Sequence, residues 1–361
     1  MKENAPHEKG SAMHLDEVRW GVLGCGAVTE VKSGPALQRV PGSRLVAVMR
    51  RSGALAADYA RRHGVPRWYD DADALLSDPE VNAVYIATPP GSHLAFALLA
   101  CAHKKPVYVE KPMARNHAEC LRMVEAFQTA KVPLFVAYYR RALPRFLKAR
   151  ELIAERALGR ITGVGCRLAG DYHRHAVAGA PLPWRLRPEE SGGGLLLDLG
   201  SHTLDLLDWL VGPLENVSGA AANVASQHEV EDNVVMQFRL ASGALGTARW
   251  NFAAGASADE ILIEGDEGEL KLTTFGDDPV ELRRASGIER FAIAHPAHIQ
   301  EPMIATVVGE LRGEGRCEST GASAARTQAV MDAALDGYYG GRDRPFWTDV
   351  ASWPGRRARR G

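Results

Sequence analysis

The chain has 361 residues, enough for about two domains, and its 46% hydrophobic and 24% charged content excludes a disordered chain or a coiled-coil rod. The formal net charge of −1 argues against broad nucleic-acid binding. No apolar run approaches the roughly 18 residues of a membrane helix, and the start of the chain lacks the apolar stretch of a signal peptide. The five cysteines have neither metal-ligand nor redox-pair spacing, which favours reduced thiols. We therefore expect a cytoplasmic protein with neither a nucleic-acid nor a membrane partner.

The first part of the chain alternates between short apolar strands and helices. Strands are predicted at Val18–Leu23, Leu45–Met49, Val81–Ala87, Pro106–Val109 and Leu134–Tyr138. Helices are expected after Gly26 as far as about Val40, and over Gly53–His63, Asp73–Leu76, His93–His103 and Asn116–Ala130. Strands separated by such helices indicate crossover connections and a parallel sheet. Residues 18–140 are therefore predicted to form a doubly wound, Rossmann-type α/β domain, preceded by a flexible tail at residues 1–17.

After Pro144 the pattern changes to alternating strands joined by short turns. An alternating segment at Arg160–Ala169 is followed by three expected hairpins: Val234–Leu240 with Ala244–Phe252, Glu260–Ile263 with Glu269–Thr273, and Val280–Arg284 with Arg290–Ile293. Consecutive hairpins form an antiparallel sheet, so residues 141–318 are predicted to be an α+β domain. A last helix is expected at Ala322–Tyr338, within residues 319–340. Residues 341–361, with four arginines near the end, are expected to be a solvated tail.

A glycine-rich loop joins the first predicted strand to the first helix. Gly24 suits a tight turn, and Gly26 lets the backbone approach a pyrophosphate. The helix start at Ala27 and Val28 would then supply N–H groups and a partial positive charge. The third glycine position of the fingerprint is Thr29, which makes the contact between helix and strand less close. In this strand–loop–helix context the loop predicts a dinucleotide site.

The end of the second predicted strand indicates which dinucleotide is bound. A site that prefers NAD places a carboxylate roughly 20 residues after the loop, where it holds the ribose hydroxyls. This chain has Arg50, Arg51 and Ser52 there, and two guanidiniums with a hydroxyl can hold a 2′-phosphate. We therefore predict a preference for NADP, with NAD as the alternative. The other interpretation of the two arginines is a solvated surface pair.

Two further segments carry candidate catalytic side chains. Lys111 follows the fourth predicted strand at its carboxyl end, where open α/β sheets bind ligands. Asp198, His202 and Asp205 share one face of a helix that the glycine triplet Gly192–Gly194 opens. This arrangement suits an acid–base histidine oriented by an acid, although a structural His–Asp pair has the same spacing. A zinc site would need a third ligand at a spacing typical of metal ligands, and none is found, so no metal is expected.

Together these segments resemble the Gfo/Idh/MocA family, which includes glucose–fructose oxidoreductase and inositol dehydrogenase. The resemblance covers about Val18 to Tyr339. The lysine–proline pair and the glycine-triplet helix, in this order and separation, are fairly specific. The residues that carry the resemblance are Gly24-Cys25-Gly26, Ala87-Thr88-Pro89-Pro90 with His93, Glu110-Lys111-Pro112, and Gly192-Gly193-Gly194 with Asp198 and His202.

The resemblance implies roles for individual residues. Lys111 is expected to be the catalytic lysine, joined to Pro112 by a cis peptide bond, and Asp198 and His202 to be the active-site acid and histidine. Further expected cofactor contacts are Thr88, Pro89, His93, Glu110, Trp184 and Arg185; further expected substrate contacts are Tyr138, Arg140 and Tyr172, the last because an aromatic ring can stack on a sugar face. The family's second domain has an open antiparallel sheet that often pairs with another subunit, so a homodimer or homotetramer is expected. Its last helix usually packs back on the Rossmann domain.

These inferences lead to reversible hydride transfer between NADP(H) and a hydroxyl-bearing carbon of a sugar, cyclitol or related polyol. His202 would give or take the hydroxyl proton, Lys111 would stabilise negative charge on oxygen, and Asp198 would orient His202 or bind a neighbouring hydroxyl. Three alternatives remain open. They are a glycoside hydrolase that uses tightly held NAD for a transient oxidation, a non-catalytic NADP-binding sensor, and a reductase of an imine or a linear tetrapyrrole.

Overall fold

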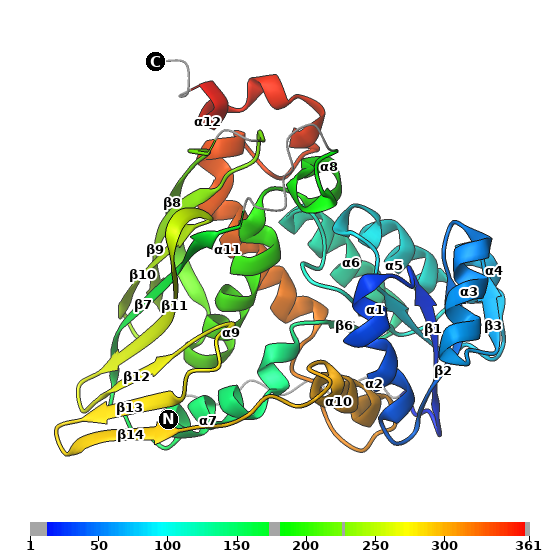
Figure 1. The fold of residues 1–361 in the computed structure, drawn as a ribbon, viewed down its shortest axis with the longest axis horizontal. Coiled ribbons are helices and arrows are strands. Elements are labelled where there is room, and N and C mark those ends of the chain that lie inside the picture. Colours follow the sequence, from blue (N-terminus) through cyan, green and yellow to red (C-terminus); the bar gives the residue numbers. More distant parts are fainter. Residues whose placement is uncertain (1–12, 173–180, 226–227, 358–361) are drawn as a thin grey trace.

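The computed structural model describes residues 13–172, 181–225 and 228–357, which form two domains (Figure 1). The first is a six-stranded parallel sheet in the order β3-β2-β1-β4-β5-β6, which confirms the predicted Rossmann-type sheet. Its strands are β1 (Val18–Leu23), β2 (Ser43–Met49), β3 (Arg67–Tyr69), β4 (Ala83–Ile86), β5 (Val107–Val109) and β6 (Leu134–Val136). Its helical segments are α1 (Ala27–Val31), α2 (Gly34–Arg39), α3 (Gly53–His63), α4 (Ala72–Ser77), η1 (Pro90–Ser92), α5 (His93–Ala102) and α6 (His117–Ala130).

Two features of this domain differ from the sequence prediction. The short edge strand β3 is not predicted, because two of its three side chains are exposed and it has no apolar pattern. The single helix expected up to Val40 is broken into α1 and α2. At the break Gly34 lies so close to the chain that a Cβ there would be 2.1 Å from the carbonyl oxygen of Thr29, and Pro35 stands in the first turn of α2.

The second domain is built on an eight-stranded sheet in the order β14-β13-β12-β11-β7-β10-β9-β8. Its strands are β7 (Ile161–Asp171), β8 (Leu214–Ala222), β9 (Asn233–Leu240), β10 (Leu245–Asn251), β11 (Ala253–Gly265), β12 (Glu269–Leu272), β13 (Val280–Arg284) and β14 (Gly287–Phe291). The three predicted hairpins are confirmed by the antiparallel pairs β9–β10, β11–β12 and β13–β14. The edge strand β8 is not predicted, because glycine, alanine and serine make up much of it and give no apolar alternation.

The sheet is mixed, and the prediction of a purely antiparallel sheet is wrong for one pair of strands. β7 pairs with β10 in parallel and with β11 in antiparallel orientation. β10 and β11 follow each other along the chain and run in opposite directions, and β7 is inserted between them. A strand between two antiparallel neighbours must be parallel to one of them.

Helices fill the space between the two sheets (Figure 1). The long helix α11 (Gly321–Tyr339) packs against α6 of the Rossmann domain as well as against β8 and α9 (Ser201–Val211). One apolar core fills the second domain and extends to the Rossmann sheet, while a second core lies under α4, α5 and α6. The other helical segments are η2 (Tyr139–Ala142), α7 (Pro144–Ala154), η4 (Trp184–Leu186), α8 (Pro188–Ser191), the π-helix η5 (Leu196–Gly200) and α10 (Glu301–Leu311).

The described part of the C-terminal segment is packed, whereas a solvated tail was expected over residues 341–361. Residues 341–357 contain η6 (Phe346–Thr348), η7 (Val350–Ser352) and α12 (Pro354–Arg357). Trp353 is fully buried, donates a hydrogen bond to the Phe346 carbonyl at 2.9 Å and lies edge-on to Tyr339. This segment therefore belongs to the core around the end of α11. Residues 1–12, 173–180 and 358–361, which include most of the expected N-terminal tail, lie outside the described residues.

Two other sequence expectations have structural counterparts. All five cysteines are buried and unpaired, in agreement with reduced thiols. Among the described residues, no helix is both long and apolar enough to cross a lipid bilayer.

Candidate active site

The glycine-rich loop lies at the carboxyl edge of the Rossmann sheet and contacts two neighbouring strands. The amides of Gly24 and Cys25 donate to the carbonyl of Met49 at 2.9 and 3.2 Å. Gly24 has φ +91°, and a Cβ there would lie 2.5 Å from Cγ2 of Thr88, so this position requires glycine. At Gly26 a Cβ would meet no atom closer than 3.8 Å, so the start of α1 is left open. The loop and the first N–H groups of α1, at Ala27 and Val28, fit a dinucleotide pyrophosphate.

The third position of the fingerprint is filled by a buried threonine that closes the first turn of α1. Thr29 donates its hydroxyl proton to the Gly26 carbonyl at 2.8 Å, and its own carbonyl accepts a hydrogen bond from Tyr59 at 2.9 Å. The departure from glycine is thus accommodated by hydrogen bonds that hold the loop in place. The candidate 2′-phosphate residues Arg50, Arg51 and Ser52 are all exposed after β2.

The segment after β4 is held by His93. Its Nε2 is 2.7 Å from the Thr88 carbonyl, and its Nδ1 is 3.2 Å from the carbonyls of Pro112 and Met113. The ring is fully buried, and this burial lowers the pKa of His93. His93 therefore joins the segments that follow β4 and β5, which is a structural role beside the expected cofactor contacts. Pro89 precedes η1 in the same segment.

Glu110 anchors the backbone beneath the candidate catalytic lysine. Its buried carboxylate accepts hydrogen bonds from Tyr85 Oη at 2.5 Å, Gln300 Nε2 at 2.9 Å and the Lys111 amide at 3.2 Å. The Lys111–Pro112 peptide bond is cis, as the family resemblance implies. The sequence places Glu110 among the cofactor contacts, but both of its oxygens are engaged by protein donors in the structure.

Lys111 meets Asp198 across the two domains. Lys111 Nζ donates to Asp198 Oδ1 at 2.7 Å and to the Asp198 carbonyl at 2.6 Å. Asp198 Oδ2 accepts from Arg185 Nε at 2.7 Å, and the Arg185 guanidinium stacks on Trp184 at 4.4 Å. Burial of Asp198 raises its pKa, but the charges and hydrogen bonds of Lys111 and Arg185 outweigh this and bring the pKa to about 2. Asp198 is therefore ionised and engaged by two cations.

His202 lies in an aromatic environment and is not oriented by Asp198. Its ring is edge-on to Tyr139 at 5.3 Å, Phe275 at 5.7 Å and Tyr138 at 6.3 Å. Its Nδ1 is buried and has no hydrogen-bond partner among the described residues. Asp198 lies in the π-helix η5 and His202 in α9, so the regular helical spacing used in the sequence analysis does not apply between them.

Positive charges surround the His202 imidazole. Burial lowers its pKa well below the ordinary value, and the charges of Lys111, Arg140 and Lys32 lower it further. The ring is thus neutral near pH 7. Tyr139, Phe275 and Lys32 were not identified from the sequence, because the tertiary structure alone brings them to His202.

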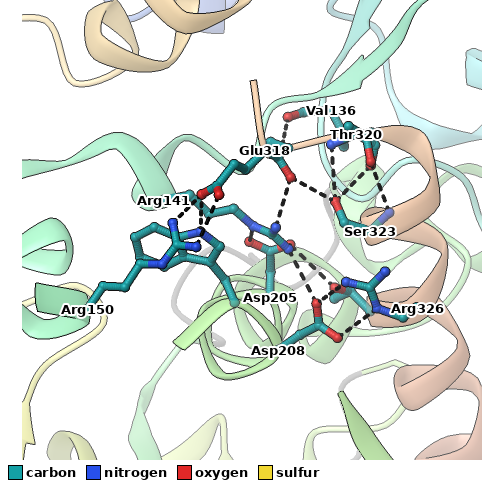
Figure 2. Close-up of polar contacts among 12 residues, drawn as sticks. Val136, Arg141, Arg150, Asp205, Asp208, Glu318, Thr320, Ser323 and Arg326 are labelled. Atoms are coloured by element: carbon teal, nitrogen blue, oxygen red, sulfur yellow. Dashed lines mark hydrogen bonds and ion pairs between the residues drawn. The ribbon is translucent and has the colours of Figure 1, made fainter. Parts of the chain in front are cut away.

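Asp205 belongs to a buried network that fixes α9 (Figure 2). Its carboxylate accepts two hydrogen bonds from Arg141, at 2.6 and 2.8 Å. Arg141 also donates to the Glu318 carbonyl at 3.0 Å, while Asp208 on α9 pairs with Arg326 on α11 at 2.7 and 3.0 Å. The predicted alignment of Asp205 with the catalytic pair is therefore replaced by a structural role. Arg141 lies in η2, the helical turn after β6, and ties α9 to the end of the Rossmann sheet.

Residues distant in sequence hold the glycine triplet. Arg342 donates to the Gly192 carbonyl at 2.7 Å, and Glu231 accepts from the Gly194 amide at 2.8 Å. A Cβ at Gly192 would lie 2.3 Å from the Arg115 carbonyl oxygen. The triplet thus lets the chain approach backbone closely before it enters η5. No local sequence signal identifies Glu231 or Arg342 as its partners.

The remaining candidate substrate contacts occupy different places. Tyr138 and Arg140 are buried next to each other after β6, and Tyr138 lies edge-on to His202. The Arg140 guanidinium is 4.4 Å from the centre of the Phe275 ring. Tyr172 follows β7, where its ring is edge-on to Phe252 at 5.6 Å. Tyr138 therefore contacts the His202 ring directly, and Arg140 and His202 both contact Phe275.

Comparisons with known proteins match both domains. Residues 18–138 match the GFO/IDH/MocA oxidoreductase family model of an NAD-binding Rossmann fold, and residues 146–271 match the GFO/IDH/MocA C-terminal domain. Oxidoreductase P35 from Formosa agariphila is 37% identical over 87% of this chain and 97% of its own length. An inositol 2-dehydrogenase from Acidothermus cellulolyticus is 27% identical over 94% of this chain and 96% of its own. A 1,5-anhydro-D-fructose reductase from Ensifer adhaerens is 29% identical over 88% and 97%.

Solved structures have the same fold. A levoglucosan dehydrogenase in complex with NADH and levoglucosan superimposes with a TM-score of 0.79 at 23% identity, covering 89% of this chain and 96% of the other. A dehydrogenase from Bordetella pertussis in complex with NADH and UDP-GlcNAcA gives a TM-score of 0.78 at 26% identity, covering 90% and 96%.

The burial of a neutral His202 predicts a specific acid sensitivity. Because the pKa of His202 in the folded protein lies well below 6.5, unfolding takes up a proton between these two values. The free energy of unfolding should therefore fall as the pH falls below 6.5, by up to about 1.4 kcal/mol per pH unit from this group. His202→Gln should remove this contribution. The measurement is urea unfolding of both proteins from about pH 7.5 to about pH 5.

His103→Gln controls for the loss of an imidazole far from the site. Parallel stability profiles for the wild type and His202→Gln would contradict the assignment of a buried neutral His202.

Proposed function

Because the chain belongs to the GFO/IDH/MocA family of oxidoreductases, we propose that it transfers a hydride reversibly between a nicotinamide cofactor and a hydroxyl-bearing carbon of a sugar, cyclitol or related polyol. The observation that carries the proposal is the meeting of Lys111 and Asp198 near a neutral His202. Lys111 follows β5 and the glycine-rich loop follows β1. Both therefore lie at the carboxyl edge of one parallel sheet, where such sheets bind ligands.

Each of the three residues has its own task in the proposed reaction. When bound, the nicotinamide ring accepts or supplies the hydride. In the oxidative direction the neutral imidazole of His202 takes the proton from the substrate hydroxyl. The Lys111 ammonium stabilises negative charge that develops on the same oxygen. Asp198 holds Lys111 by its ionised carboxylate, so it aims the lysine and leaves the histidine free to face the substrate.

The named relatives favour this function over the alternatives from the sequence. Those reported above are dehydrogenases, a reductase and an oxidoreductase, and none is named as a hydrolase or as acting on an imine or a tetrapyrrole. The presence of both Lys111 and His202 argues against a non-catalytic sensor. Relatives that act on inositol, anhydrofructose and levoglucosan support a hydroxylated, sugar-like substrate.

Replacement of either catalytic side chain should reduce turnover strongly. Lys111→Ala and His202→Ala should each lower kcat with NAD(P) and polyol by roughly 10²–10⁴-fold, because a positioned proton-transfer or charge-stabilising group contributes about this much. Steady-state absorbance at 340 nm measures the rate. Lys148→Ala on α7 and His103→Ala after α5 are matched controls. Rates close to wild type in both site variants would exclude the proposed site.

We further propose that NADP is preferred over NAD. The side chains of Arg50 and Arg51 are exposed directly after β2, and neither makes a hydrogen bond or an ion pair with another described residue. Both guanidiniums are thus available to a 2′-phosphate, which Arg binds through charge-assisted, two-pronged hydrogen bonds. The hydroxyl of Ser52, the residue before α3, is a third candidate donor.

The double substitution Arg50→Ala/Arg51→Ala should weaken NADP binding selectively. Loss of hydrogen bonds to a charged phosphate costs about 1.5–3 kcal/mol, so Kd for NADPH should rise by roughly 10–100-fold while Kd for NADH stays nearly constant. Calorimetric titration measures both constants. Arg122→Ala, an exposed arginine on α6, is the control. Equal affinities of the wild type for NADH and NADPH would refute the preference.

Self-association through the outer face of the large sheet is also proposed. Burial alternates along β9 and β10, so one face is covered and the other is exposed. The exposed face carries Val235 and Leu245, which are 44% and 61% exposed. A hollow on this face is lined by apolar residues such as Ala220 and Val235 together with polar ones such as Gln237 and Arg249. Apolar groups on an open sheet favour contact with a second copy of the chain.

Charged substitutions on this face should dissociate the protein. Val235→Glu with Leu245→Glu places like charges on both sides of a symmetric contact, and a homodimer or homotetramer should become a monomer. Light scattering coupled to size-exclusion chromatography gives the mass. A wild type that is already monomeric at about 10 μM, a concentration at which stable dimers persist, would refute the proposal.

A further inference from the structure

One buried cation near His202 forms no ion pair with any residue that the structure describes. Arg140 lies in η2, directly after Tyr139, and is only 4% exposed. Its guanidinium makes no hydrogen bond and no ion pair with any other described residue, and its Nε atom is fully buried without a partner. The neighbouring arginines differ in their hydrogen bonds. Arg141 is paired with Asp205. Arg145 also has a buried Nε without a partner, but its terminal nitrogens donate to Thr273 Oγ1 at 3.0 Å and to the Asp278 carbonyl at 2.8 Å.

Such a group is costly to bury. A guanidinium stays protonated in proteins, and an unpaired buried charge loses its hydration without compensation. The rings of Phe275 and Tyr139, at 4.4 and 5.3 Å, offset part of this cost by cation–π attraction. The charge of Asp259 also favours the protonated guanidinium, but this carboxylate makes no hydrogen bond with Arg140 and instead accepts three backbone N–H bonds from residues 274–276. Arg140 thus keeps donors that the described protein does not use.

Arg140 shares its surroundings with the proposed proton acceptor. Tyr139 and Phe275 each contact both the Arg140 guanidinium and the His202 ring. The charged groups that act most strongly on His202 are Lys111, Arg140 and Lys32, all of them cations. The carboxylate of Asp198, which precedes α9, is engaged by Lys111 and Arg185. The electrostatic potential around the reacting hydroxyl is therefore positive.

We propose that the substrate is an anionic polyol, a sugar acid whose carboxylate forms a two-pronged ion pair with Arg140. The inference rests on the proposed function, because it places the carboxylate near the hydroxyl that His202 deprotonates. The planar fork of arginine matches a carboxylate in geometry and charge. One unpaired guanidinium balances a single negative charge, which favours a carboxylate over a doubly charged phosphate ester. Arg140 then acts as a specificity-determining residue.

Matched pairs of ligands test the inference. D-glucuronate with D-glucose, D-galacturonate with D-galactose, and D-gluconate with D-sorbitol differ within each pair at one terminal carbon, which is a carboxylate in the acid. Calorimetry in saturating NADPH measures binding without turnover. At least one acid should bind about tenfold or more tightly than its neutral partner, and Arg140→Met should abolish the difference. Arg140→Lys keeps the positive charge but loses the planar pair of donors, so it should retain part of the difference in affinity.

Stability measurements separate this role from a structural one. Removal of an unpaired buried charge should raise the Tm of ligand-free Arg140→Met, or leave it unchanged. The adjacent Arg141→Met breaks a buried ion pair and should lower Tm clearly. A large loss of Tm in Arg140→Met would identify a structural residue and overturn the inference.

The binding outcomes also distinguish this inference from the proposed function. Equal binding of each acid and its neutral partner, or no binding of any acid, would overturn the anionic-substrate inference. If the enzyme oxidises neutral polyols with NADP but does not oxidise the acids, the anionic-substrate inference is overturned and the proposed function stands. Failure of the wild type to bind NADPH or NADH at all would instead count against the proposed function.

Discussion

The active site depends on the way α9 is held between the two domains. The pair between Arg141, after β6, and Asp205, on α9, is almost fully buried, and Asp208 extends it to Arg326 on α11 (Figure 2). Breaking a buried pair by removing one partner typically costs 3–5 kcal/mol, because the other charge is left without compensation. The network therefore limits α9 to one position relative to the Rossmann sheet. That position sets His202 against Tyr138 and Tyr139, which belong to the same segment as Arg141.

A second connection between the domains joins two of the candidate catalytic residues. Lys111 comes from the end of β5, and Asp198 comes from the π-helix that leads into α9. Buried hydrogen bonds hold the backbone next to each of them. Glu110 accepts from the Lys111 amide, and Glu231 and Arg342 bind the glycine triplet that precedes Asp198. Reactive groups held by such a shell lose little freedom when the substrate arrives, which is the usual basis of orientation in catalysis.

The charge distribution gives the site its chemical character. Neutral His202 is under the influence of the cations Lys111, Arg140 and Lys32, and the charge of Asp198 is balanced by Lys111 and Arg185. Arg140 adds a positive charge that the described protein does not pair. A fold selected only for stability would replace this guanidinium by an apolar side chain, so its presence is best explained by a ligand that supplies the missing negative charge. Substrate choice and proton transfer then depend on the same local field.

Local patterns in the sequence were sufficient for the Rossmann sheet, the three hairpins and the last long helix, and together with the family resemblance they singled out Lys111, Asp198 and His202 as candidates. Such patterns act over neighbouring residues: apolar runs make buried strands, and glycines mark turns and close approaches.

The local patterns could not show the edge strands β3 and β8, the parallel β7–β10 pair and the packed C-terminal segment. Only the tertiary structure decided that Asp198 holds Lys111 instead of His202, that Asp205 pairs with Arg141, and that Arg140 is left without a partner. The two ion pairs join residues far apart in the sequence: Lys111 and Asp198 are 87 positions apart, and Arg141 and Asp205 are 64. The third outcome is the absence of a neighbour. Electrostatic pairing depends on distance in space and on burial, and neither is encoded in the local order of residues.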